Sequence, residues 1–334
     1  MSAFVPSSMK FIAIAVLVCL CIPLLGYFIA QLRVAAMKRS LSWALAVGSI
    51  AFIDLATADE PAGFRMSVII GVLLYGMKSV IYSEYVIREK RTIPFFRWVL
   101  FHLWFGMRPY VFMRKKDKPY ADASRYFLDG FKRLLFGIAL VLLSWGIWKF
   151  GIHFRWNRGL AAITATAPLL IGLSFIVHFG VFNLVTGYWR QLGYECQRLF
   201  RNPIRSTSLN EFWGRRWNLA FLEMTALGVY RPLSQIISHK SALFLAFLFS
   251  GILHELAISL PVRQGFGLPM LYFILHGIAM SAERAMERKG RPISAIPWVG
   301  RVWTMSWLLV PMPILFHAPF LKMIVWPIVG IRIS

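Results

Sequence analysis

The chain has 334 residues, of which 58% are hydrophobic, and it carries a formal charge of +23 at neutral pH. Several apolar runs approach 20 residues, the length that an α-helix needs to cross a hydrocarbon core about 30 Å thick, which excludes an ordinary soluble domain. The runs are continuously apolar, whereas strands of a membrane β-barrel alternate in polarity over about ten residues. We therefore expect an all-α, polytopic membrane protein.

Eight apolar runs are candidate membrane spans. No internal repeat or long polar linker interrupts them, so we treat residues 1–334 as a single integral membrane domain. The first run is longer than the apolar core of a secretory signal, about 7 to 15 residues, and no small-residue cleavage site follows it, so we expect it to remain as an anchor. The expected spans are Phe11–Ala30, Leu41–Ala56, Met66–Tyr82, Leu134–Phe150, Leu160–Thr186, Ala242–Leu260, Leu268–Ala282 and Val302–Phe320.

Basic residues gather between these spans. Loops 33–40, 83–133, 187–241 and 283–301 contain 28 of the 37 Lys and Arg residues. Because loops rich in Lys and Arg stay in the cytoplasm, we expect these four loops to be cytoplasmic and both termini to lie outside. This topology, together with contacts to anionic lipid headgroups, accounts for the charge. We therefore expect membrane lipids, and not nucleic acid, as partners.

Cysteine and histidine give no sign of a metal centre. Cys19, Cys21 and Cys196 lack the paired spacing of zinc and redox motifs, and the seven histidines are dispersed along the chain. Membrane hydroxylases and desaturases need histidines clustered at short spacing, so we set that class aside. We expect no bound metal and no cofactor.

Two segments between spans have an unusual composition. Residues 93–113 are rich in aromatics and carry three basic or histidine side chains, which suits an interfacial helix. Its tryptophans either belong to an aromatic belt or form a lateral door for a lipid substrate. After the fifth span, arginines recur from Arg190 to Arg205 on a segment that we expect to be a juxtamembrane helix ended by Pro203.

A further helix is expected to begin at Ser208, because Glu211 three residues later completes an S-x-x-E capping box. Its continuation, Leu219–Tyr230, is apolar but interrupted by Glu223. Irregular backbone at membrane depth is tolerated only against protein or around a cavity. We expect a short re-entrant or interfacial helix here.

His254 and Glu255 lie inside the sixth expected span, and ionisable residues at that depth are functional candidates. Burial disfavours the imidazolium form, so His254 would be a neutral general base. The alternative is a histidine that only hydrogen-bonds a neighbouring helix, and we prefer that alternative for His178 and His276.

The segment F-W-G-R-R-W-N at Phe212–Asn218, followed by S-G-I-L-H-E at Ser250–Glu255, resembles the wax synthase branch of the membrane-bound O-acyltransferase (MBOAT) superfamily. The resemblance covers about residues 185–285. It implies a bundle of about eight transmembrane helices around an intramembrane chamber, with an MBOAT-like core. It also implies transfer of a fatty acyl group from acyl-CoA, a co-substrate, to the hydroxyl of a lipophilic long-chain alcohol, which gives a wax ester.

In that reaction the resemblance makes Asn218 and His254 the catalytic residues. His254 would take the proton of the attacking alcohol, and Asn218 would donate to the developing oxyanion or hold a substrate in line. Arg215 and Arg216 would meet the phosphates of CoA, or else lipid headgroups. The other candidates for substrate binding are Phe212, Trp213, Trp217, Ser250 and Glu255.

Two of these candidates also have structural interpretations. Ser250 lacks the sharp turn of a nucleophilic serine, and with Gly251 it suits close helix packing. Glu255 lies about 100° around the helix from His254, so it could instead pair with an arginine or orient the re-entrant segment.

Two other functions remain open. One is an acetyl-CoA-dependent O-acetyltransferase that acts on a sterol, terpenoid or polyketide hydroxyl. The other is a proton-coupled transporter that uses His254, Glu255 and His276, although the inverted repeats of transporters are not evident. The host membrane, a bacterial inner membrane or the endoplasmic reticulum, and the oligomeric state are also left open by the sequence.

Overall fold

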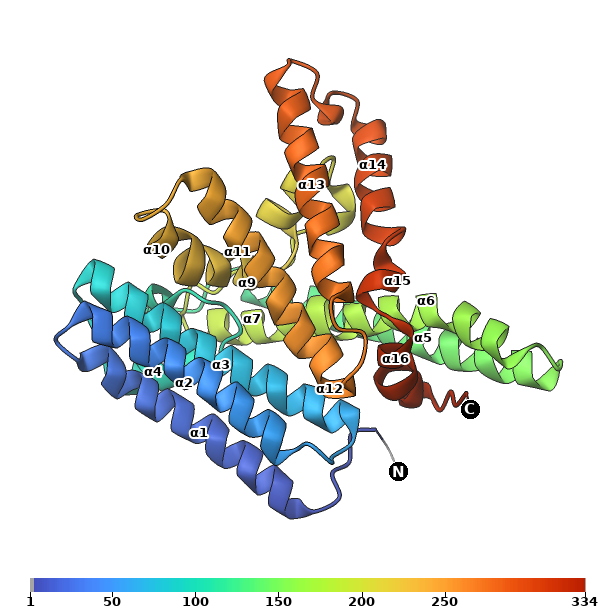
Figure 1. The fold of residues 1–334 in the computed structure, drawn as a ribbon, viewed down its shortest axis with the longest axis horizontal. Helices are drawn as coiled ribbons and strands as arrows, with labels where there is room; N and C mark the ends of the chain where they lie inside the picture. The colour runs from blue at the N-terminus through green and yellow to red at the C-terminus, as the bar shows by residue number, and fades with distance from the viewer. Residues whose placement is uncertain (1–2, 334) are drawn as a thin grey trace. The chain divides into compact units, whose positions relative to one another are not determined.

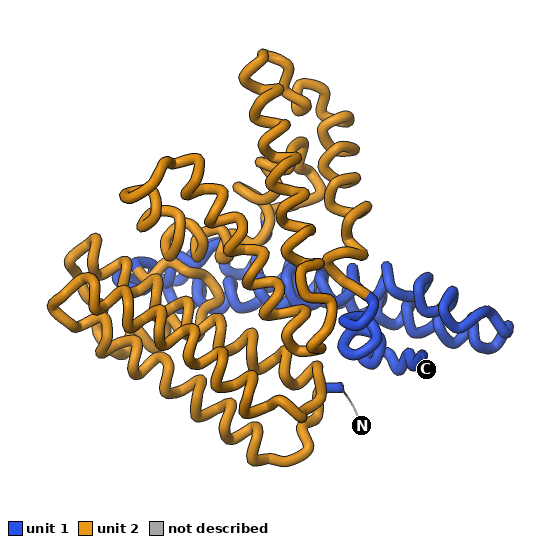
Figure 2. The backbone as a smooth tube through the Cα atoms, in the orientation of Figure 1, with its two compact units in different colours: residues 1–3, 110–200, 318–334 blue, residues 4–109, 201–317 orange. Residues whose placement is uncertain are grey.

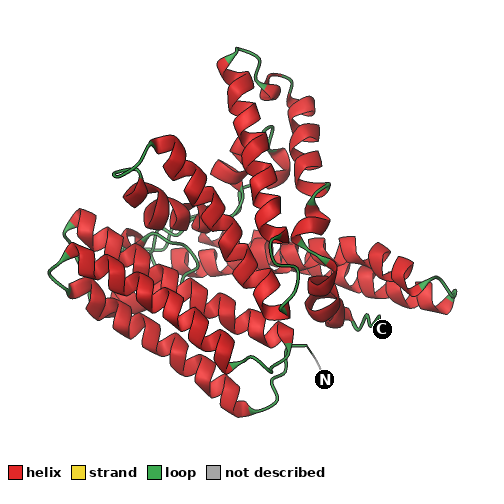
Figure 3. Cartoon of the chain, in the orientation of Figure 1, coloured by secondary structure: helices red, strands yellow, loops and turns green. Residues whose placement is uncertain are grey.

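The protein is all-helical, as predicted. The computed structural model describes residues 3–333, and no strand occurs among them (Figures 1 and 3). The chain divides into two compact units (Figure 2), one made of residues 4–109 and 201–317 and the other of residues 110–200 and 318–333 with residue 3. The single membrane domain expected over residues 1–334 stays a prediction.

The larger unit holds three long N-terminal helices and most of the second half of the chain (Figure 1). Its helices are α1 (Met9–Gln31), α2 (Ala35–Ala56), α3 (Ala62–Glu89), α4 (Phe95–His102), α8 (Leu209–Glu211), α9 (Leu219–Thr225), α10 (Arg231–Leu233), α11 (His239–His254), α12 (Leu260–Val262), α13 (Leu268–Arg288), α14 (Pro297–Leu309) and α15 (Met312–Leu315).

Small residues let α1, α2 and α3 pack closely. A Cβ atom at Gly26 of α1 would lie 2.2 Å from the hydroxyl of Ser79 on α3, and one at Gly76 of α3 would lie 3.0 Å from the Cα atom of Ala46 on α2. In a membrane, helix association depends on such close packing, because lipid tails are as apolar as the side chains. The outward faces of the bundle stay apolar, as Leu17 (61% exposed) and Leu20 (66% exposed) illustrate.

The smaller unit contains a hairpin of long helices in which α5 packs against α6 and α7. Gly137 of α5 and Gly172 of α6 meet at the crossing, where a Cβ atom on either would lie within 3 Å of the other's carbonyl oxygen. The α-helices of this unit are α5 (Ala123–His153), α6 (Arg158–Ser174), α7 (Phe182–Gln191) and α16 (Ala318–Phe320).

Among the described residues, 6 helices are long and apolar enough to cross a membrane, or 7 if the broken pair Pro297–Leu315 and Ala318–Val329 is one span. The expected number of eight is therefore not confirmed. The expected span Leu268–Ala282 became part of α13, which is not among the six, because it continues into the charged residues Glu283 and Arg284. The chain is a multi-pass membrane protein on this count.

The juxtamembrane helix expected up to Pro203 is wrong. Helix α7 ends at Gln191, and Gly193 adopts a left-handed φ of 87°. A side chain at residue 193 would collide with the carbonyl oxygen of Lys116, 2.2 Å from its Cβ position, and the Gly193 carbonyl accepts a hydrogen bond from Lys116 N–H (2.9 Å). The glycine therefore ends the helix so that two loops can pair.

The interfacial segment at residues 93–113 forms α4 and a short 3-10 turn at Pro109–Phe112. Trp98 is fully buried, and its indole N–H donates to the Pro23 carbonyl of α1 (2.9 Å). The buried Lys78 ammonium donates to the carbonyl oxygens of Phe101 (2.8 Å) and Gly106 (2.9 Å). These bonds dock α4 against α1 and α3, and the lateral door stays untested.

Candidate active site

His254 is the last residue of α11, where the helix changes from α to π geometry over Glu255–Ser259. Its Nδ1–H donates to the carbonyl oxygen of Ser250, one turn earlier, at 2.7 Å. Because that carbonyl can only accept, the proton sits on Nδ1 and the lone pair on Nε2. The ring is half-buried, and no described residue hydrogen-bonds Nε2. This tautomer suits a general base.

Asn218 begins α9 and is its N-cap. It has a left-handed backbone (φ 41°), which asparagine tolerates better than most residues, and its side-chain Oδ1 accepts from Phe221 N–H at 3.2 Å. With Oδ1 committed to the cap, the Nδ2 amide group is left as a donor. The local sequence therefore fixes which end of this amide can reach a substrate.

The two predicted catalytic residues contact the same phenylalanine. Asn218 holds the backbone N–H of Phe221, and the Phe221 ring lies 5.2 Å from the His254 ring, centroid to centroid. Helix α9 also packs against α11. The structure thus brings the two motifs together at Phe221.

A second aromatic residue links His254 to the F-W-G-R-R-W-N segment. The Phe273 ring of α13 lies 4.3 Å from the His254 ring and 5.5 Å from Trp213. Trp213 also meets the fully buried His276 edge to face at 5.7 Å. His276 Nδ1–H donates to the Tyr272 carbonyl one turn earlier in the same helix (2.8 Å), so the ring forms part of this aromatic wall.

The arginine-bearing segment Phe212–Arg216 is a π-helical turn that follows α8. Ser208 caps α8 as predicted, since its hydroxyl accepts from Glu211 N–H at 3.0 Å. The Glu211 carboxylate reaches back to Thr207 N–H (2.8 Å) and also accepts from Arg216 Nε (2.7 Å). Burial raises the pKa of Glu211, but these hydrogen bonds outweigh it and hold the pKa below its usual value. The carboxylate is therefore ionised at neutral pH.

Arg215 and Arg216 differ in their surroundings. Arg216 is bound to Glu211 and to the carbonyl oxygen of Arg201 (3.3 Å), so it holds the turn together. Arg215 is exposed, and it has no hydrogen bond or ion pair with any described residue. Of the two, only Arg215 can meet an incoming anion without breaking a contact.

Phe212 and Trp217 lie in a packed cluster. Their rings stack 5.4 Å apart, nearly parallel at 14°. Phe212 is 6% exposed and packs with Leu209, Ala279 and Leu308. These two candidates for substrate binding therefore anchor the turn to α13 and α14.

Ser250 and Gly251 serve helix packing. The Ser250 hydroxyl donates back to the Ala246 carbonyl (3.3 Å), and only its backbone carbonyl contacts His254. A Cβ atom at Gly251 would lie 2.6 Å from the Met270 sulfur on α13. This pair brings α11 and α13 close enough for Phe273 to reach His254.

Glu255 caps α13. One carboxylate oxygen, Oε1, accepts from the N–H groups of Gly267 (2.9 Å) and Met270 (3.0 Å) in the first turn of that helix, where a negative charge is favourable. The arginine partner considered for Glu255 is absent among the described residues, but its structural role is present. It fixes the start of the helix that carries Phe273.

Sequence reasoning missed Glu283, which holds the motif in place. It is 6% exposed, and its oxygens accept from Leu209 N–H (2.6 Å), Asn210 N–H (2.9 Å) and the Trp303 indole N–H (2.9 Å). Arg284 donates to the Asn210 side-chain oxygen at 3.2 Å. The available signal is an acidic residue directly after an apolar run, but its position in the predicted loop 283–301 conceals it.

Glu283→Gln should destabilise the protein by about 1 to 3 kcal/mol, because an amide group replaces one acceptor oxygen and leaves a buried N–H unsatisfied. Glu287→Gln, one turn further on an exposed position of α13, should change stability by less than about 0.5 kcal/mol. Thermal unfolding in detergent measures both. Equal melting temperatures for the two variants would remove Glu283 from this role.

Residues 196–275, which include both motifs, match the profile of the Membrane bound O-acyl transferase family. The chain is 34% identical to "Probable long-chain-alcohol O-fatty-acyltransferase 6" of Arabidopsis thaliana over 222 residues, which are 60% of this chain and 61% of that protein. It is 31% identical to "Long-chain-alcohol O-fatty-acyltransferase" of Simmondsia chinensis over 137 residues, which are 36% of this chain and 39% of that protein. The chain thus spans less than two thirds of the length of either relative.

The resemblance predicted from Phe212–Asn218 and Ser250–Glu255 is confirmed by these matches. Asn218 and His254 both fall inside the matched segment. Through the region that carries both motifs, the chain resembles the wax synthase branch of the membrane-bound O-acyltransferase family.

Proposed function

We propose that this protein transfers a fatty acyl group from acyl-CoA to the hydroxyl of a long-chain alcohol. The relatives are named for acyl transfer to long-chain alcohols, which favours this reaction over acetyl transfer and over transport. Acyl-CoA is the co-substrate that supplies the acyl group.

In the proposed reaction His254 Nε2 takes the proton of the alcohol as its oxygen attacks the thioester carbonyl carbon. The new C–O bond forms, and the carbonyl oxygen becomes an oxyanion that the Nδ2–H of Asn218 stabilises. The C–S bond then breaks, and the CoA thiolate takes the proton from His254. No acyl-enzyme intermediate is needed, because both substrates are held together.

One observation carries the proposal. Asn218 and His254, 36 residues apart in the chain, both contact Phe221. The Nδ2 amide group of Asn218 and the Nε2 lone pair of His254 have no hydrogen-bond partner among residues 3–333. An acceptor and a donor around one apolar ring are what proton removal from an alcohol and oxyanion stabilisation require.

The arrangement of substrates is also proposed. Acyl-CoA would arrive from the cytoplasm, on the side of the basic loops, and Arg215 would bind its phosphates because guanidinium groups suit phosphate oxygens. The alcohol would enter from the bilayer. The membrane is either a bacterial inner membrane or the endoplasmic reticulum.

Arg215→Gln should raise the KM for acyl-CoA about tenfold and leave kcat unchanged, because the phosphates lie far from the reacting carbonyl. This is the loss expected for one charge-assisted hydrogen bond, about 1.5 kcal/mol. Arg216→Gln should instead lower the melting temperature, since it releases Glu211. Steady-state kinetics and thermal unfolding separate the two. An unchanged KM in Arg215→Gln would show that Arg215 does not bind acyl-CoA and would favour its alternative role, contact with lipid headgroups.

Ester formation tests the proposed function. Purified protein in detergent would receive radiolabelled palmitoyl-CoA or acetyl-CoA together with a fatty alcohol, a sterol or diacylglycerol. Wax ester from palmitoyl-CoA and the fatty alcohol is the expected product. Product only from acetyl-CoA would establish the acetyltransferase instead.

A further inference from the structure

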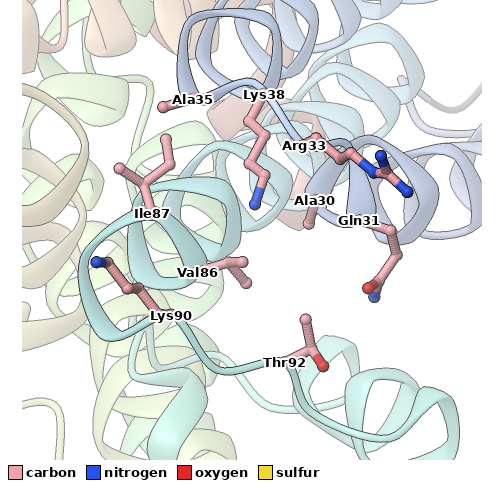
Figure 4. Close-up of a pocket in the computed structure, with 9 residues that line it drawn as sticks. All are labelled: Ala30, Gln31, Arg33, Ala35, Lys38, Val86, Ile87, Lys90 and Thr92. Atoms are coloured by element: carbon pink, nitrogen blue, oxygen red, sulfur yellow. The ribbon is translucent and has the colours of Figure 1, made fainter.

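A second polar site lies at one end of the α1–α3 bundle, within the larger unit. A pocket of about 470 Å³ opens where α1 ends, α2 begins and α3 ends (Figure 4). No residue of the candidate active site lines it. Its lining consists of Ala30, Gln31, Arg33, Ala35, Lys38, Val86, Ile87, Lys90 and Thr92.

The pocket is cationic. Arg33, Lys38 and Lys90 line it together with no acidic side chain, and none of their three side chains has a hydrogen bond or ion pair with a described residue. Two neighbouring arginines do form ion pairs: Arg39 pairs with Glu84, and Arg88 pairs with Glu89. Glu84 and Glu89 therefore neutralise arginines outside the pocket and not the three cations that line it.

Helix dipoles do not account for Lys38. Arg33 and Lys90 follow the C-termini of α1 and α3, where a cation is favourable. Lys38 lies in the first turn of α2, where a cation is unfavourable, and that turn holds no acidic residue. Its ammonium group extends into the middle of the pocket, above Val86 (Figure 4). An anion in the pocket would offset this cost.

The position indicates an amphiphilic occupant. All three helices are candidate spans, so the end of the bundle marks the boundary between hydrocarbon and headgroups. Apolar side chains face outward next to the pocket, with Phe28 61%, Met37 48% and Leu41 42% exposed. A phosphate would meet the Lys38 ammonium in the middle of the pocket, and the exposed Arg33 and Lys90 side chains, which point away on either side in Figure 4, would turn inward to join it. The acyl chains would cover the outward apolar side chains.

We propose that the pocket formed by Arg33, Lys38 and Lys90 binds the phosphate-bearing headgroup of an anionic phospholipid. Attraction of basic side chains to anionic lipids acts within a Debye length of the membrane surface, about 8 Å at physiological salt, and the pocket lies at that boundary. Soluble phosphates, including that of coenzyme A, share this chemistry, and the experiment below distinguishes them.

The test measures binding of a fluorescent phosphatidylglycerol to the purified, delipidated full chain in a neutral detergent. The triple variant Arg33→Gln, Lys38→Gln and Lys90→Gln should bind it at least tenfold more weakly. The matched control is Arg114→Gln, Lys115→Gln and Lys118→Gln, which removes the same charge from exposed positions outside the pocket, and it should bind within twofold of wild type. Lys38→Gln alone should give an intermediate loss, and it guards against misfolding of the triple variant.

Competition identifies the source of the phosphate. Unlabelled phosphatidylglycerol should displace the probe, whereas phosphatidylcholine, inorganic phosphate and coenzyme A at equal concentration should not. If the pocket variant and the control variant lose the same amount of phosphatidylglycerol binding, the loss reflects only the change in net charge, and the proposal is overturned. Displacement by coenzyme A or inorganic phosphate would overturn it in favour of a soluble ligand.

Discussion

His254→Gln should reduce the turnover of ester formation by about 10² to 10⁴-fold, the range for removal of a general base, with little change in KM. Glutamine keeps an N–H group that can donate to the Ser250 carbonyl, the partner of the native ring at 2.7 Å. What it lacks is the basic lone pair that Nε2 offers. The measurement is kcat for a fatty alcohol with palmitoyl-CoA.

His178→Gln is the matched control for this prediction. His178 also lies within a candidate span, and it also bonds one turn back, to the Ser174 hydroxyl at 3.1 Å. The control should retain turnover within about threefold and a similar melting temperature. Wild-type turnover in His254→Gln would remove His254 from the mechanism, and equal losses in both variants would indicate a general cost of changing a buried histidine.

The sequence was sufficient for the class of fold because a membrane imposes one dominant rule. Every backbone polar group must be paired inside the segment, so a continuous apolar run near 20 residues has only one solution. The rule weakens where a helix mixes apolar and charged residues. The apolar run Leu268–Ala282 predicts a membrane span, but α13 continues beyond it into Glu283 and Arg284. Glu283 accepts from the Asn210 backbone N–H, and Arg284 donates to the Asn210 side-chain oxygen. Tertiary contacts of this kind have no local signal.

The candidate site also has one part that the sequence predicts and one part that depends on tertiary contacts. Asn218 and His254 could be named from their motifs, and the structure brings both to Phe221. The separation of Arg215 from Arg216 could not be predicted, because it depends on Glu211 turning back toward Arg216 across a π-helical turn. The role of Phe273 depends on the close approach of α11 and α13 at Gly251, which one sequence cannot specify.

Asn218→Gly should lower turnover by about 10² to 10³-fold, the cost of losing one oxyanion donor, while the protein stays folded. Glycine adopts the left-handed φ of 41° without strain, and at an N-cap it costs only a few tenths of a kcal/mol. Alanine would lose the cap and also strain the backbone by about 1 to 2 kcal/mol. Glycine is therefore the variant that separates chemistry from stability.

Asn218→Asp distinguishes the two roles of Asn218, donation to the oxyanion and capping of α9. A carboxylate still accepts from Phe221 N–H, but it can donate a hydrogen bond only when it is protonated. Turnover of this variant should fall as pH rises through the carboxyl pKa, a dependence that the wild-type amide cannot show. Asn157→Asp is the control, since Asn157 caps α6 by accepting from Gly159 N–H at 2.8 Å. It should leave the pH profile unchanged. If Asn218→Gly melts early and Asn218→Asp is fully active at every pH, the residue acts only as the cap of α9, and the oxyanion donor lies elsewhere.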